Sequence, residues 1–144
     1  MQTIIIHEVT LPDQVLTNAL NRLLPQLAPE AKTLSLNDVK AITESDGSHL
    51  YIMETGSETI GTYTLCTYES PTGRKVWLED VIVDSRYRGK GLGRQLVAHA
   101  MSEAKRFAPC TLLLTSRPSR IAANALYHAI GMESKETNVY KKTI

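Results

Sequence analysis

The sequence has few cysteines and no cluster of metal-binding residues. Its 144 residues include two cysteines, Cys66 and Cys110, and four histidines that are scattered along the chain. No Cys/His spacing resembles a metal site, so we expect no metal. Both cysteines lie in segments predicted to be strands, where they are most simply buried thiols of a reducing compartment. We therefore expect a cytoplasmic protein.

Long apolar runs and an excess of charge of one sign are also missing. The apolar runs are far too short to span a bilayer, and the N-terminus shows no secretory signal. Lys and Arg number 16 and Asp and Glu 15, so the net charge is +1. Such a balance creates no global field that would favour nucleic acid or an anionic membrane, and we expect neither as a partner. Positive charge gathers only at residues 86–94.

The rest of the composition is that of an ordinary globular domain, with 42% hydrophobic and 22% charged residues. The length suffices for one substantial core, and the chain shows no internal repeat or linker, so we expect a single domain over 1–144. Periodicity and turn residues predict its elements. The expected strands are 3–9, 49–55, 58–68, 75–84, 110–116 and 137–143, and the expected helices are 15–27, 36–45, a long one from Leu92, and one from Ser119 as N-cap to Gly131.

The stretch from Trp77 to Phe107 organises the chain. Its first part is β-branched and apolar, which predicts a strand buried on both faces, and its last part carries the apolar stripe of an amphipathic helix. Between them three glycines alternate with basic residues. A helix start has unpaired N–H groups and partial positive charge, and glycines allow close approach. This order therefore predicts an anion site suited to phosphate.

Neither of two common phosphate-binding motifs fits these glycines. The dinucleotide fingerprint needs Gly-x-Gly-x-x-Gly, and the P-loop needs a Gly-Lys-Ser/Thr run, which is missing. The stretch instead resembles the acetyl-coenzyme A motif of the GNAT superfamily of N-acetyltransferases, Arg/Gln-x-x-Gly-x-Gly/Ala. Both Arg88–Gly93 and Arg86–Gly91 match this motif, and the helix that starts at Leu92 favours the first. The later Ala-Leu-Tyr-His-Ala-Ile-Gly-Met resembles the family's Ala-x-x-Tyr-x-x-x-Gly-Phe signature, with Met132 in place of Phe.

The resemblance implies a fold and a coenzyme site. The fold is of the α/β (α+β) type, a mixed and mostly antiparallel sheet with helices on both faces. In the family, the backbone of the central strand binds the pantetheine arm as another strand would, which points to Val81, Ile82 and Val83. The glycine-rich turn would hold the phosphates of acetyl-coenzyme A through Arg88, Gly89, Lys90, Gly91, Leu92, Gly93 and Arg94.

The last helix is predicted to have two different faces. Its aliphatic face, from Ile121 to Ile130, is expected to pack on the sheet, while Arg120, Asn124 and Tyr127 share the opposite face. Without a family resemblance, that face is more simply a solvated surface with a partly exposed tyrosine. The resemblance implies that Tyr127 lies beside the sulfur of the coenzyme and acts as the general acid of the reaction. It also implies that Asn124 contacts the coenzyme arm. Many relatives have Asn in place of Arg120, which leaves a contact from Arg120 open.

Glu79 and Asp80 are candidate bases. Their side chains would lie on opposite faces of a regular strand, so both could line one site only if the strand is distorted. A carboxylate, or a water that it holds, can accept the proton of an ammonium acceptor. The alternative is that they pair with Arg86 or cap a backbone N–H. Trp77 is an acceptor-side candidate that is more simply a core residue, and Tyr51, Tyr63 and Tyr68 are expected to pack.

The leading hypothesis is an N-acetyltransferase that moves acetyl from acetyl-coenzyme A to a primary amine by direct attack in a ternary complex. No cysteine occupies a motif position suited to a covalent route. A non-catalytic acetyl-coenzyme A sensor with the same fold is the alternative, and a nucleotide or nucleic-acid binder would rest on the basic turn alone. The acceptor stays open among antibiotic, polyamine, amino sugar, amino acid and peptide or protein amines. The C-terminal edge strand could pair two subunits into a homodimer.

Overall fold

The structure is a computed structural model that describes residues 3–144. The chain forms two compact units, one ending at Leu114 and the other running from Thr115 to Ile144. The first unit contains a five-stranded sheet and three α-helices, and the second contains one α-helix with irregular chain on both sides. The residues expected to bind a coenzyme are divided between these two units.

The first unit is built on a mixed sheet with the strand order β1-β2-β3-β4-β5. Strands one to four pair antiparallel with one another in sequence, and the fifth pairs parallel with the fourth, as a crossover connection through a helix requires. The mostly antiparallel sheet is thus confirmed, although the strand expected over 110–116 shrinks to three residues. The strands are β1 (Ile4–Glu8), β2 (Ser48–Thr55), β3 (Glu58–Ser70), β4 (Gly73–Val83) and β5 (Thr111–Leu113).

Three helices flank this sheet, and local sequence signals set their ends. Asp13 caps α1 (Gln14–Leu23) by accepting the N–H of Leu16 at 2.8 Å, and Ser35 forms a capping box at the start of α2 (Leu36–Glu44). Pro25 lies in the 3₁₀ turn η1 (Leu24–Gln26) that ends α1 before the expected limit at residue 27, because proline cannot continue the helical hydrogen-bond pattern. The third helix, α3 (Leu92–Ala104), begins at the residue where the long helix was expected to begin.

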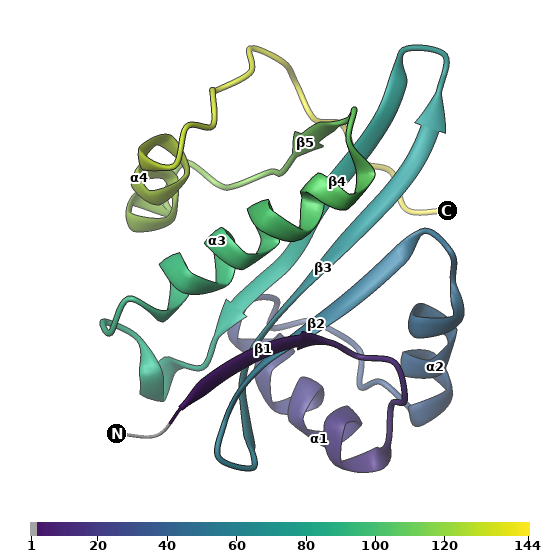
Figure 1. The fold of residues 1–144 in the computed structure, drawn as a ribbon, viewed down its shortest axis with the longest axis vertical. Coiled ribbons are helices and arrows are strands. Elements are labelled where there is room, and N and C mark those ends of the chain that lie inside the picture. The colour runs from purple at the N-terminus through teal and green to yellow at the C-terminus, as the bar shows by residue number, and fades with distance from the viewer. Residues whose placement is uncertain (1–2) are drawn as a thin grey trace. The chain divides into compact units, whose positions relative to one another are not determined.

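The two faces of the sheet have separate cores, and alternate residues of β2 contribute to each. Tyr51 and Met53 join the side chains of α3, while Leu50 and Ile52 pack with those of α1 and α2. Figure 1 shows α3 along one side of the sheet and α1 with α2 on the other. Helices on both faces are therefore confirmed. Tyr51 and Tyr63 are fully buried, and their rings stack with centroids 4.5 Å apart.

Several packing predictions for the first unit are wrong. Val15, expected on the apolar stripe of α1, is 74% exposed, and Tyr68 is 49% exposed. Trp77 is half-buried rather than in the core, and its indole Nε1–H donates to the Tyr68 hydroxyl at 3.4 Å. Both Tyr68 and Trp77 lie where neither core extends. Cys66 lies in β3 as expected, whereas Cys110 precedes β5, and both are half-buried free thiols.

The second unit holds α4 (Ile121–Ala129). Gly131, with φ of +94°, ends it as expected. The predicted cap is wrong, because Arg120 rather than Ser119 occupies the N-cap and makes no side-chain capping bond. The predicted edge strand over 137–143 is also wrong, since residues 115–144 contain no strand. Its weak alternation lacks a continuous apolar face, which is what fixes strand register.

The expected orientation of α4 is reversed. Ile121 is 78% exposed, whereas Tyr127 is the buried residue of the helix. Four of its nine residues are alanines, whose small side chains bury little apolar area. The large ring of Tyr127 gains more from burial than they do, and the aliphatic stripe was therefore a poor guide to the buried face.

Candidate active site

The glycine-rich turn has the backbone that its sequence predicts. Gly89 and Gly91 have φ values of +79° and +77°, in the left-handed region that favours glycine. Gly91 is the N-cap of α3, and Gly93 lies in its first turn with ordinary helical geometry. A Cβ atom at any of these three positions would meet no heavy atom within 4 Å. The glycines therefore border open space.

The start of α3 presents backbone donors to that open space. The first intrahelical bond runs from Gln95 N to the Gly91 carbonyl at 3.2 Å. Within residues 3–144, the N–H groups of Leu92, Gly93 and Arg94 have no hydrogen-bond acceptor, and no side chain caps them. The Leu92 side chain is buried in the core, so only its backbone can face a ligand. Three adjacent unpaired donors at a helix N-terminus can bind an anion.

The basic side chains around the turn differ in what they contact. Arg88, Lys90 and Arg94 are exposed and form no ion pair with any carboxylate of the described chain. Arg88 Nε donates to the Val83 carbonyl at 3.2 Å, and Lys90 Nζ lies 5.3 Å from the centroid of the Tyr87 ring. These three positive charges remain available to an anion.

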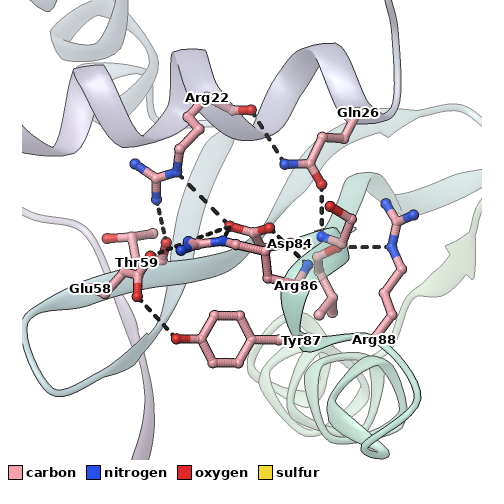
Figure 2. Close-up of polar contacts among 10 residues, drawn as sticks. Arg22, Gln26, Glu58, Thr59, Asp84, Arg86, Tyr87 and Arg88 are labelled. Atoms are coloured by element: carbon pink, nitrogen blue, oxygen red, sulfur yellow. Dashed lines mark hydrogen bonds and ion pairs between the residues drawn. The ribbon is translucent and has the colours of Figure 1, made fainter.

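Arg86 is by contrast fully engaged with acidic side chains (Figure 2). Its guanidinium pairs with Glu58 and, at 2.9 Å, with Asp84. The carboxyl of Asp84 also accepts the Arg86 N–H at 3.1 Å. Because Arg86 is held in this way and α3 begins at Leu92, the structure favours the Arg88–Gly93 match to the motif over the Arg86–Gly91 match.

The central strand, β4, leaves part of one edge without a strand partner. Within the described residues, β5 pairs only with Lys75–Trp77. From Leu78 to Val83, the edge of β4 on the β5 side carries no paired strand. The side chain of Ile82 is buried, and those of Val81 and Val83 pack against the α3 core. Backbone groups of this segment can therefore bind an extended chain.

A bulge distorts β4 at the two acidic residues. In β3, Thr64 pairs with Glu79. Two positions earlier, Thr62 pairs with Ile82, so one residue of β3 lies opposite two residues of β4. Asp80 has φ of +52°, which is unusual for a residue with a side chain. The strand distortion that would allow both carboxylates to line one site is therefore present. The prediction of a strand buried on both faces is wrong at Glu79 and Asp80, since both residues are exposed.

Glu79 and Asp80 have no cationic partner. Neither side chain forms an ion pair or a hydrogen bond with the described residues, so the alternative in which they pair with Arg86 or cap a backbone N–H is not observed. Partial desolvation of the exposed Glu79 carboxyl, and secondly repulsion from Asp80, raise the pKa of Glu79 above its usual value. Burial and the charges of both carboxylates also raise the pKa of the Cys66 thiol, against a hydrogen bond from Ser48. That thiol is therefore a poor nucleophile.

Tyr127 and Asn124, the predicted acid and the predicted contact to the coenzyme arm, lie in the second unit. Burial raises the pKa of the Tyr127 phenol, while Arg120 acts to lower it. The Asn124 side-chain amide donates to the Arg117 carbonyl at 3.0 Å. Inside this unit, Asn124 thus holds the segment before α4. The roles of both residues toward a coenzyme remain predictions.

Sequence reasoning missed the residues that hold the turn in place. Asp84 is 1% exposed and central to a network that includes Arg22, Gln26 and Glu58 (Figure 2). An aspartate directly after a buried strand and before a basic turn was a usable signal for Asp84. No local pattern marks Gln26, whose side-chain Oε1 accepts the N–H of Ser85, 59 residues later in the chain.

Residues 3–144 contain neither a metal-binding cluster nor a membrane-spanning helix. No group of three or more His, Cys, Asp and Glu residues in the described chain is arranged to hold a metal ion. Among the same residues, none of the helices combines the length and the apolar character that a membrane crossing requires.

Comparison with known proteins relates the chain to acetyltransferases. Residues 16–132 match the acetyltransferase (GNAT) family. The chain is 30% identical to N-acetyltransferase 8B of Rattus norvegicus over 103 residues, which is 70% of this chain and 46% of that protein. It is 41% identical over 54 residues to the ribosomal protein bS18-alanine N-acetyltransferase of Escherichia coli, which is 38% of this chain and 36% of that enzyme. The chain thus spans less than half the length of either relative.

A solved structure supports the same fold. Aminoglycoside N-acetyltransferase AAC(6')-Iy in complex with CoA superposes with a TM-score of 0.79 at 18% identity, covering 99% of this chain and 96% of that one. At this identity the likeness concerns the fold alone. Together with the family match over most of the sequence, it leads to one conclusion: this chain belongs to the acetyltransferase (GNAT) family.

Proposed function

We propose that this protein transfers the acetyl group of acetyl-coenzyme A to a primary amine by direct attack in a ternary complex. The observation that carries the proposal is the turn of Gly89 and Gly91, which leads into three unpaired N–H groups at the start of α3. Family membership supports the choice of coenzyme. A non-catalytic sensor would need this turn as well, but it would not need the unpaired carboxylates of β4.

The binding roles follow from the donors and charges of the first unit. The N–H groups of Leu92–Arg94, with the charges of Arg88, Lys90 and Arg94, would hold phosphate oxygens. The open edge of β4 at Val81–Val83 would bind the amide-containing arm through its backbone. Acetyl-coenzyme A supplies the acetyl group as a thioester. The residues of this chain orient it and move the protons.

Glu79, with Asp80, is the proposed base. An amine attacks only as the free base, so its proton must pass to a carboxylate or to water. Because the pKa of Glu79 is raised, this carboxylate is a better proton acceptor than an ordinary exposed glutamate. The poor nucleophilicity expected of Cys66 agrees with direct attack and with the absence of an acetyl-cysteine step.

Tyr127 is the proposed acid. The departing thiolate needs a proton, and reference pKa values of ~8.5 for a thiol and ~10 for a phenol make the transfer nearly balanced. Burial raises the pKa of Tyr127, which makes the phenol a weaker donor than the reference value implies, so the proposed transfer depends on the position of the phenol beside the sulfur. A Tyr127→Phe variant retains the ring, so it should stay folded while its turnover falls by about 10–10³-fold.

The proposal is tested by measuring thiol release from acetyl-coenzyme A over a panel of amines. The panel includes peptides with N-terminal alanine or internal lysine, an aminoglycoside and a polyamine. We expect at least one amine to accelerate release. Glu79→Gln and Asp80→Asn are then compared with the parent across pH. The loss of turnover, about 10²-fold for a missing base, should be greatest at pH values above the pKa of the carboxylate and below the pKa of the amine, where the base is ionised and the amine is mostly ammonium. Coenzyme binding without turnover on any amine would favour the sensor instead.

A further inference from the structure

We infer that Gln26 and Asp84 are positioning residues, which fix the backbone before the glycine-rich turn so that the turn can bind the coenzyme. Neither side chain lies in the Arg88–Gly93 motif, and Gln26 comes from η1, far away in the sequence. The inference rests on the proposed function, because it concerns the affinity of that same site for coenzyme A.

Asp84 holds the start of the turn from inside the protein. Its side chain is nearly inaccessible, at 2% exposure, whereas that of Arg86 is 56% exposed. One carboxylate oxygen accepts the backbone N–H of Arg86 at 3.1 Å, and the other accepts from the guanidinium at 3.3 and 2.9 Å. The Arg86 guanidinium, more than any other group, holds the pKa of the Asp84 carboxyl below its usual range. The carboxylate therefore fixes both the main chain and the side chain of Arg86.

Gln26 holds the same segment from the side of α1 (Figure 2). Its Oε1 accepts the Ser85 N–H at 2.9 Å, and its Nε2 donates to the Arg22 carbonyl at 3.5 Å. Arg22 in turn approaches Asp84, with Nε 3.9 Å from a carboxylate oxygen, and donates to the Thr59 carbonyl at 2.8 Å. Successive backbone N–H groups of the turn, at Ser85 and Arg86, are thus bound by side chains from outside the motif.

Glu58, the first residue of β3, completes the attachment. Glu58 accepts the Tyr87 hydroxyl at 3.0 Å and pairs with Arg86. The segment Ser85–Tyr87 is therefore attached to three parts of the first unit, which are η1, the β2–β3 hairpin and the end of β4. The glycines that follow have no comparable attachment.

This contrast has a consequence for binding. Glycine is the residue with the most backbone freedom to lose, and ordering a loop on binding lowers affinity. Fixing the segment that precedes Gly89 limits the conformations from which the coenzyme must select. Gln26 is exposed and adds nothing to either core, so its contact to Ser85 should influence the turn far more than the global stability.

The test compares Gln26→Ala with Gln14→Ala by calorimetric titration with coenzyme A. Gln14 is an exposed glutamine of α1 whose amide donates to Asn18 at 2.8 Å, away from the turn, so its variant is the matched control. One lost hydrogen bond should weaken coenzyme A binding by about 3–10-fold in Gln26→Ala. The KM for acetyl-coenzyme A should rise with kcat unchanged. Gln14→Ala should bind as the parent does.

Hydrogen exchange without coenzyme provides the second readout. The Ser85 amide should exchange faster in Gln26→Ala than in the parent, while amides of the sheet core keep their rates. Unchanged affinity in Gln26→Ala, or equal weakening in both glutamine variants, would overturn the inference and leave the proposed function standing. Parent protein that fails to bind coenzyme A would overturn both.

Discussion

The basic stretch from Asp84 to Arg94 has two halves that look alike in sequence and differ in structure. In the anchored half, Asp84–Tyr87, side chains and backbone N–H groups are bound by Gln26 of η1, by Asp84 itself and by Glu58 of the β2–β3 hairpin. In the open half, Arg88–Arg94, three N–H groups have no acceptor in the described chain and the glycines border free space. Arginine occurs in both halves, so positive charge alone does not mark the ligand site. What distinguishes the candidate ligand site is that these N–H groups have no acceptor, and its basic side chains form no ion pair, within the described chain.

The largest effect should come from placing a large side chain in the open half. Gly93 has helical geometry, and a Cβ at this position would have no heavy atom within 4 Å, so Gly93→Leu should fold and gain up to ~1 kcal/mol of helix stability. Because the family motif admits alanine here, Gly93→Ala is the matched control and should bind as the parent does. The larger side chain would occupy space that the phosphates need. Overpacking costs about 1–3 kcal/mol, so coenzyme A should bind about 10–100-fold more weakly by calorimetry. A more stable Gly93→Leu variant with parental affinity would show that the coenzyme binds elsewhere.

The second largest effect should be a loss of folding stability when Asp84 of the anchored half is changed. Asp84→Asn removes a buried charge that Arg86 pairs with, and a charge-assisted hydrogen bond is worth about 1–3 kcal/mol. The pKa of Asp84 is lowered in the folded protein, so its contribution is present above the unfolded-state pKa of ~3.9 and is lost as pH falls through the folded-state pKa.

The measurement for Asp84→Asn is urea unfolding at several pH values. The stability difference between parent and variant should be full at neutral pH and shrink steadily in acid. If the difference is the same from neutral pH down to the acid limit, the charge of Asp84 contributes nothing, and the anchored half would be held by neutral hydrogen bonds.

The smallest effect is a difference in the salt dependence of coenzyme A binding between variants of Arg94 and Arg86. Arg94→Gln removes an unpaired charge from the open half. The affinity of this variant for coenzyme A should fall by about 3–10-fold at low ionic strength. The loss should be much smaller at high ionic strength, because salt screens exposed charges. Arg86→Gln acts through the conformation of the turn, so its loss of affinity should change little with salt. Titrations at two salt concentrations would refute the distinction if both variants showed the same salt dependence.

Local signals predicted the elements on which the site is built. Ser35 caps α2 where a helix over 36–45 was expected, and the glycines placed the start of α3 at Leu92 because only glycine favours the left-handed backbone there. These features depend on neighbours a few residues away. Periodicity failed on α4, where alanines give little contrast between faces, and over 137–143, where Val139 and Tyr140 are both exposed.

The parts that could not be predicted depend on distant partners. The bulge at Asp80 arises from the register of β4 against β3, which no local pattern in β4 encodes. The anchored half depends on Gln26 and Glu58, which are brought to the turn only by the fold. The candidate phosphate site was therefore predictable from its motif, whereas the structure that holds it was not.

Amide hydrogen exchange with and without coenzyme A tests the central claim most directly. If the open half binds the coenzyme, the N–H groups of Leu92–Arg94 should become protected on binding, because each gains a phosphate acceptor. The N–H groups of Ser85 and Arg86 already have acceptors in Gln26 and Asp84, so their rates should change little. Bound coenzyme A that leaves the exchange of Leu92–Arg94 unchanged would contradict the account.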